Sequence, residues 1–285
     1  MPEFYITKYN GEKELFDPIK LKSSLLKIGA KEDVAELVMN EVARNTRDGT
    51  STRDIYRLAF SLLKKRQRPV AIRYSLKKAI AELGPTGFPF EKYVAELFKA
   101  QGYKTDTDRI IKGNCVEHEI DVLAWNEQKL ILTEAKFHTD FTMKSDLKVA
   151  LYIKARFEDL ARSKIMIEGK ERVMTEGCLI TNTKFSQTAM DYGQCQQLNM
   201  IGWNYPYGNN LHNMIEKAEL IPITALTTIN SAEKNVFLSR GIVLSKSLLD
   251  ANLLQSLGFS NNKIKNLKVE IEELREHCRE ATKIL

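Results

Sequence analysis

The sequence has few cysteines and no long apolar run. Its four cysteines, at positions 115, 178, 195 and 278, include no C-x-x-C pair, so their spacing predicts neither a zinc site nor a disulfide framework. Charges interrupt the first residues of the chain, and no segment approaches the length of a membrane span. We therefore expect a cytoplasmic protein with reduced thiols and no membrane partner.

Glycine-rich phosphate loops are also missing, since the sequence contains neither a P-loop nor G-x-G-x-x-G. What it does contain is ordinary globular composition, with 43% apolar and 28% charged residues in 285. That length is enough for two modest cores. Lys and Arg outnumber Asp and Glu by 43 to 37, and the resulting charge of +6 permits a nucleic-acid partner without proving one.

Residues 1–84 are expected to form a small, mostly helical domain. Alternating segments on either side of Asn10-Gly11 predict a two-stranded hairpin. Asp17 followed by Pro18 predicts a capped helix that ends at Gly29. Further apolar stripes predict three more helices, and the run Gly84-Pro85-Thr86-Gly87 ends the block because glycine and proline disfavour helix.

Residues 85–230 predict an α/β domain. A helix with an apolar face around Val94 is followed by a turn and a charged loop. Strands are expected at 117–124, 129–137 and 177–181, with a helix over 143–161 between the last two.

Residues 231–285 predict a C-terminal helical segment. From Leu267 to Leu285, apolar residues alternate at spacings of four and three, which gives about two and a half heptads. Packing on the chain's own core is the first interpretation of this seam, and a contact within a homo-oligomer is the second.

Charged side chains interrupt the two strands expected at 117–124 and 129–137. Residues two apart in a strand point to the same face, so Glu134 and Lys136 lie side by side. Asp121 in the preceding strand can meet Glu134 across the hairpin. Charge in a core strand is costly unless it is paired, and this placement favours a functional site. The same spacing also occurs by chance in many proteins.

Two neighbouring carboxylates repel each other unless a cation joins them. Mg²⁺, or Mn²⁺ in its place, meets that need, with Asp121, Glu134 and the carbonyl of Ala135 as the expected ligands. Lys136 can orient a water or stabilise developing negative charge, and Glu91 at the start of the preceding helix can supply another carboxylate. This set predicts phosphodiester hydrolysis.

The segments GFPFEKYVAELFKAQGY, HEIDV, ILTEAKFH and GCLITNTKFSQTAMDYGQCQQLNMIGW resemble the PD-(D/E)XK nucleases, particularly the Mrr-like restriction endonucleases. The resemblance covers roughly residues 87 to 205 and places the family's catalytic residues on Glu91, Asp121, Glu134 and Lys136. It implies a restriction-endonuclease-like mixed sheet core flanked by helices, and Mg²⁺-dependent cleavage of double-stranded DNA.

This sequence departs from the Mrr-like pattern in the helix after the E-x-K strand. Many Mrr-like members carry a glutamine there, whereas this sequence offers Lys144, Asp146, Lys148 and Lys154. His118 and His138 flank the motifs, but histidines in such places are more often hydrogen-bonded neighbours than catalytic bases.

The segments ITKYNGEKELFDPIKLKSSLLKIGA, TSTRDIYRLAFSLL and AIRYSLKKAI resemble the ATP-cone domain of ribonucleotide reductases and their regulators. The resemblance implies an ATP or dATP effector. It places the nucleotide contacts on six positions: Lys8, Glu14, Asp17, Lys20, Thr52 and Tyr56.

Two functions follow from these patterns. The first is a nucleotide-regulated, metal-dependent DNA endonuclease acting in restriction or defence. The second is a catalytically inactive DNA-binding regulator that keeps the nuclease fold and senses ATP or dATP. Cleavage of DNA under some divalent metal distinguishes the two.

Overall fold

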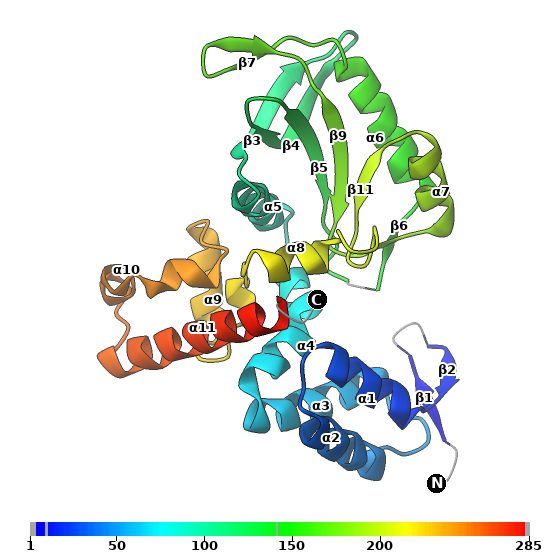
Figure 1. Ribbon diagram of the computed structural model, residues 1–285, viewed down its shortest axis with the longest axis vertical. Helices are drawn as coiled ribbons and strands as arrows, with labels where there is room; N and C mark the ends of the chain where they lie inside the picture. Colours follow the sequence, from blue (N-terminus) through cyan, green and yellow to red (C-terminus); the bar gives the residue numbers. More distant parts are fainter. Residues whose placement is uncertain (1–3, 9–10, 141, 283–285) are drawn as a thin grey trace. The chain divides into compact units, whose positions relative to one another are not determined.

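The chain forms two compact units, Met1–Leu76 with Glu272–Leu285, and Lys77–Ile271. The computed structural model describes residues 4–8, 11–140 and 142–282 (Figure 1). The sequence-based division at 84 and 230 differs from these compact units. The boundary between the compact units after Leu76 falls inside a helix, α4, and their boundary after Ile271 falls inside the last helix, α11.

The first unit is a small hairpin followed by helices. Strands β1 and β2 pair antiparallel, with Ile6 opposite Glu14. Their predicted turn residue Asn10 lies outside the described residues. The elements are β1 (Tyr5–Thr7), β2 (Lys13–Leu15), α1 (Pro18–Lys27), α2 (Glu32–Asn45), α3 (Thr52–Arg66) and α4 (Arg68–Ala81), which begins here.

The predicted helix caps in this unit are present. The Asp17 side chain accepts hydrogen bonds from the backbone N–H groups of Ile19 and Lys20, at 2.9 and 3.3 Å. Gly29, with φ +88°, follows α1. The helices bury one apolar face each, and this core includes Leu25, Ala35, Val38, Val42, Ala59 and Leu63.

The second unit is built on a mixed five-stranded sheet in the order β11-β9-β5-β4-β3. Strands β3, β4 and β5 run antiparallel, whereas β5, β9 and β11 run parallel. The strands are β3 (Lys104–Lys112), β4 (Glu117–Trp125), β5 (Leu130–Lys136), β9 (Glu176–Thr181) and β11 (Asn199–Ile201).

Helices cover both faces of this sheet (Figure 1). Helix α5 (Phe88–Ala100) packs on β3, β4 and β5, whereas α6 (Leu147–Leu160) packs on β9 and α7 (Gln187–Cys195) packs on β11. Leu123 and Leu132 of the sheet share a core with Phe157 of α6. The predicted α/β class, a mixed sheet flanked by helices, is confirmed.

Short elements complete the second unit. Two of them, β6 (Lys144–Ser145) and β10 (Lys184–Phe185), form a small parallel ribbon, and β7 (Ile165–Ile167) and β8 (Lys170–Arg172) form a hairpin. The remaining elements are α8 (Leu211–Lys217), a 3₁₀ turn at Ile223–Ala225, α9 (Ser231–Ser239), a 3₁₀ turn at Ser245–Leu249, α10 (Ala251–Ser256) and α11 (Asn261–Thr282).

Two predictions for this unit are wrong. The charged loop expected after α5 is the nine-residue strand β3, whose pairing with β4 organises polar residues that carry no apolar alternation. The helix expected from 143 begins only at Leu147, because Asp146 caps it through the N–H of Val149 and the two residues before the cap pair as β6.

The apolar seam of α11 is buried within the single chain. Leu267, Ile271 and Leu274 are at most 1% exposed. Packing on the chain's own core is therefore confirmed as the first interpretation, although Leu285 lies outside the described residues. Over residues 4–8, 11–140 and 142–282, no helix combines the length and the apolar character that crossing a membrane requires.

Candidate active site

The sequence-predicted catalytic residues line one cleft of about 490 Å³ in the second unit. Glu91 reaches it from the first turn of α5, Asp121 from β4, and Glu134 and Lys136 from β5. Backbone and side chains at the end of β5 complete the lining, including Ala135, Phe137 and His138.

Asp121 stands where β4 and β5 separate. The last registered pair of this ladder is Val122 with Thr133. Beyond this pair, the Asp121 carboxylate accepts a 2.7 Å hydrogen bond from the backbone N–H of Ala135 in β5. This bond fixes one oxygen of Asp121 next to the E-x-K segment.

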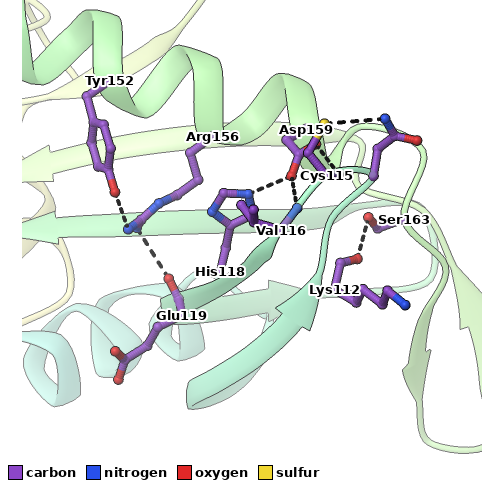
Figure 2. Close-up of polar contacts among 10 residues, drawn as sticks. Lys112, Cys115, Val116, His118, Glu119, Tyr152, Arg156, Asp159 and Ser163 are labelled. Carbon is purple, nitrogen blue, oxygen red and sulfur yellow. Dashed lines mark hydrogen bonds and ion pairs between the residues drawn. The ribbon is translucent and has the colours of Figure 1, made fainter.

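Glu134 pairs with Arg156, a residue of α6 that the sequence analysis did not single out. The Arg156 guanidinium forms an ion pair with the Glu134 carboxylate, and these side chains are 14% and 17% exposed. It also donates to the carbonyl of Glu119 and to the Tyr152 hydroxyl, both at 3.3 Å (Figure 2). The guanidinium carbon of Arg156 also lies over the ring of Tyr152, 5.2 Å from the ring centroid.

A signal for Arg156 does exist in the sequence. Helix α6 buries Ala150, Ile153 and Phe157, and Arg156 falls three residues after Ile153, beside that stripe. A charge at the border of a buried stripe needs a partner on the facing element. Of the four residues that the sequence analysis placed in this helix, Lys148 and Lys154 lie in α6 as expected, whereas Lys144 is in β6 and Asp146 is the cap.

Three carboxyl groups of the cleft, those of Glu91, Asp121 and Glu134, have a raised pKa. Burial, followed by the charge of Asp121, raises the pKa of Glu134 to about 7, although Arg156 opposes the shift. Burial also raises the pKa of Asp121, against the hydrogen bond from Ala135 and the charge of Arg156. Raised pKa values on neighbouring acids are typical of catalytic clefts and metal sites.

The pKa of Glu91 is raised to about 8 by burial and by the neighbouring carboxylates Asp121 and Asp108. Asp108 sits in β3 with φ +57°, between the registered pairs of Thr107 and Arg109. Gly87 leaves room for Glu91, because a Cβ there would lie 2.9 Å from the Glu91 Oε1 atom.

The two histidines flanking the motifs have structural partners. His118 Nε2 contacts Asp159 Oδ2 at 2.8 Å, and this bond is the main reason that the pKa of Asp159 falls to about 2. Asp159 also accepts the N–H of Cys115, so the pair ties the β3–β4 turn to α6 (Figure 2). His138 lines the cleft and bonds Ser145 Oγ at 3.1 Å, and burial lowers its pKa.

The donor set of the cleft fits a hydrated hard cation. No group of three or more His, Cys, Asp or Glu side chains arranged for a metal occurs over residues 4–8, 11–140 and 142–282. Zinc sites draw three or four ligands from the protein, whereas Mg²⁺ is held by one or two carboxylates and keeps several waters. Asp121, Glu134 and the Ala135 carbonyl match the second type.

Three of the six predicted nucleotide contacts of the first unit, Lys8, Glu14 and Lys20, lie together. The Glu14 carboxylate pairs with Lys8 at 2.6 Å and with Lys20 at 3.1 Å. Hydrogen bonds to these lysines lower the pKa of Glu14. The segment before Thr52 lies beside β1, since Ser51 bridges Thr7.

Tyr56 lies one turn further along α3 and is part of an aromatic stack. Its ring lies 5.0 Å from that of Tyr74, with planes 14° apart. Asp17 is occupied in capping α1. The structure thus brings the two lysines and Glu14 together, while Asp17 and Tyr56 have structural roles of their own.

Comparison with known proteins gives an archaeal relative. An uncharacterized protein of Archaeoglobus fulgidus is 30% identical over 192 residues, which is 67% of this chain and 99% of that protein. The crystal structure of AF1548, a protein of unknown function, is also 30% identical, covers 70% of this chain and 98% of its own, and superposes with a TM-score of 0.50. This chain belongs to the AF1548-like family.

Two family models locate the similarity. Residues 84–205 match the model described as restriction endonuclease, and residues 221–275 match the C-terminal region of AF1548-like proteins. The first match indicates a nuclease of the restriction type. MspJI restriction endonuclease in complex with a 27-mer oligonucleotide is 11% identical, covers 60% of this chain and 36% of its own, and has a TM-score of 0.36.

Proposed function

We propose that this AF1548-like protein is a metal-dependent DNA endonuclease acting in restriction or defence. The observation that carries the proposal is the convergence of Glu91, Asp121, Glu134 and Lys136 on one cleft. The restriction-endonuclease match over residues 84–205 contains all of them and supports the same chemistry.

Asp121, Glu134 and the carbonyl of Ala135 would hold Mg²⁺ or Mn²⁺. When bound, such a cation activates water and neutralises charge on the phosphate. Glu134, with a pKa of about 7, would lose its remaining proton on binding a cation.

Three further residues would take part without holding the cation: one exchanges a proton, one contacts the phosphate and one positions Glu134. Glu91, with a pKa of about 8, can exchange a proton near neutral pH. Lys136 is exposed at the cleft and can donate to a phosphate oxygen. Arg156 orients Glu134 through their ion pair, so it is a positioning residue.

Cleavage of plasmid DNA tests this function. Supercoiled plasmid is incubated with Mg²⁺ or Mn²⁺ and the wild type, Asp121→Asn, Glu134→Gln or Lys136→Met, with Lys170→Ala in the β7–β8 hairpin as the surface control. We expect each cleft variant to lose at least about 100-fold in rate and the control to match the wild type. Equal nicking by all proteins would contradict the proposal.

The inactive-regulator alternative gives a different result in the same assay. Such a protein binds DNA in a salt-sensitive way and cleaves it under no metal, while the cleft variants bind as the wild type does.

We also propose that the first unit binds ATP or dATP. Lys8 and Lys20 both pair with the carboxylate of Glu14 in β2, so two ammonium groups lie within reach of one anionic ligand. A triphosphate can compete with Glu14 for them, and Thr52 begins the neighbouring helix.

Calorimetric titration with ATP and dATP tests nucleotide binding. The variant Lys8→Ala/Lys20→Ala should lose at least about 10-fold in affinity. The matched control, Lys27→Ala/Lys31→Ala, removes two exposed charges from the same unit and should bind as the wild type does. Equal affinity of both variants would place the nucleotide elsewhere or nowhere on this unit.

A further inference from the structure

The ribbon formed by β6 and β10 places two lysines directly beside each other. Lys144 and Lys184 are Cα partners in this parallel pair, and both are exposed. Their successors Ser145 and Phe185 are also partners, and they are 1% and 5% exposed. Because side chains alternate in a strand, the lysines point to solvent on one face while the next pair points into the protein.

A buried polar network fixes this ribbon to the end of the catalytic strand. Asn182, fully buried, accepts the N–H of His138 at 2.8 Å and donates to the His138 carbonyl at 2.7 Å. Ser145 Oγ contacts His138 Nε2 at 3.1 Å, and Thr181 is 3.5 Å from Ser145. Since His138 lines the cleft, the ribbon has a fixed position at its rim.

The arrangement concentrates positive charge. The side chains of Lys144 and Lys184 form no hydrogen bond or ion pair within residues 4–8, 11–140 and 142–282. Burial and the charge of Lys184 lower the pKa of Lys77 in α4 to about 8, although Asp140 at the cleft opposes the shift. Like charges placed beside each other in a sheet repel, so an anionic group bound between the two lysines would relieve that repulsion.

We propose that Lys144 and Lys184 form a lysine rim that binds the phosphodiester backbone of double-stranded DNA next to the phosphate in the cleft. The inference rests on the proposed nuclease function and names the surface that would hold the substrate. Separate ammonium groups on an open surface suit successive backbone phosphates, whereas a single free phosphate is usually enclosed by converging N–H donors.

Salt-dependent binding of a fluorescent DNA duplex by the full chain tests the lysine rim. Binding is measured in EDTA, so that no cleavage occurs, for the wild type and Lys144→Ala/Lys184→Ala. The matched control is Lys164→Ala/Lys170→Ala, which removes one charge just before β7 and one in β8, at the other end of the sheet (Figure 1).

We expect the rim variant to lose about 10-fold in affinity and its log–log salt slope to fall by about two, one for each phosphate contact. The control should keep the slope of the wild type. The melting temperature of the rim variant should equal or exceed that of the wild type, because a like-charge pair is removed. This result would separate lost binding from lost folding.

Several outcomes would overturn the lysine rim. Unchanged affinity and slope in the rim variant would do so, as would an equal loss in the control, or binding of inorganic phosphate alone without the duplex. Plasmid cleavage that depends on Asp121 but not on the rim lysines would leave the nuclease function standing and reject the rim. Absence of cleavage and of duplex binding by the wild type would reject both.

Discussion

Arg156 favours the charged form of Glu134 in a place where burial favours the neutral form. The guanidinium pairs with the Glu134 carboxylate, and it is the main influence that lowers the pKa of this group against burial and Asp121. The pairing therefore predicts that Arg156→Gln raises the pKa of Glu134 above its value of about 7, by roughly one pH unit. Arg156→Lys, which retains the charge, should raise it less.

Carboxyl NMR titration of the metal-free protein measures this effect. Arg162→Gln, which removes an exposed arginine just after α6, serves as the control and should leave Glu134 unchanged. A Glu134 that titrates at the same pH with and without Arg156 would mean that the ion pair does not determine its charge.

The raised pKa of Glu91 predicts that the metal-free protein loses stability as the pH rises. Its folded pKa of about 8 lies above the ordinary 4.5, so the folded state holds a proton that the unfolded state releases. This contribution is fully present below about pH 4.5 and is lost as the pH rises through about 8. Glu91→Gln should therefore match the wild type at the acid end and be the more stable protein at the alkaline end.

The expected gain is at most about 1 kcal/mol after solvent screening, because Glu91 is only half-buried, and this corresponds to roughly 2–4 °C. Melting in EDTA across this pH range measures it. A wild-type minus variant difference that is constant with pH would show that Glu91 titrates normally. Added Mn²⁺ should weaken the trend in the wild type, since a cation held by Asp121 and Glu134 would offset the negative charge beside Glu91.

At the scale of elements, the ends of β5 and β9 are held together by one side chain. Asn182 makes two hydrogen bonds with the backbone of His138 and is fully buried. Asn182→Ala leaves both His138 backbone groups without these partners, and it should cost about 2–4 kcal/mol in the free energy of unfolding. Asn209→Ala, at an exposed position, should change it by less than about 0.5 kcal/mol.

Urea unfolding measures both variants. Asn182→Asp keeps an acceptor for the His138 N–H and should recover part of the loss. If Asn182→Ala costs no more than Asn209→Ala, the network does not fix the ribbon, and the rigid placement of the lysine rim would lose its basis.

Helices and strands with a strong periodic pattern could be predicted from the sequence. Strands that form only because they hydrogen-bond to another strand could not. Alternation located β4 and β5, and the Asp17 cap located α1. Strand β3 was missed because its residues are mostly polar and its structure comes from hydrogen bonding to β4. The ribbon of β6 and β10 joins two residues from each of two distant segments, which no local pattern reveals.

The candidate site divides in the same way. Strand geometry placed Glu134 beside Lys136 and allowed Asp121 to approach, because both relations depend on alternation and adjacent pairing. The contact of Arg156 with Glu134 depends on how α6 crosses the sheet, and that crossing is a property of the packed core.

For the whole molecule, two helices run without interruption across the division between the compact units. Helix α4 spans Arg68–Ala81 and α11 spans Asn261–Thr282, whereas the division falls after Leu76 and after Ile271. Flexible boundaries between independent domains usually fall in linkers rich in glycine, proline and polar residues. Buried apolar residues occur in both helices on either side of the division, as shown by Ile72, Ile80, Leu267 and Leu274.

This continuity predicts that the two units unfold together. Differential scanning calorimetry of the metal-free chain should show one transition, because melting one unit removes a turn or more from helices that the other unit needs. Mn²⁺ would bind in the second unit, yet it should move the whole transition upward by linkage. ATP, which we expect in the first unit, should do the same. Two transitions, of which each ligand moves only one, would show instead that the units unfold independently. Nucleotide binding would then not change the stability of the unit that contains the cleft.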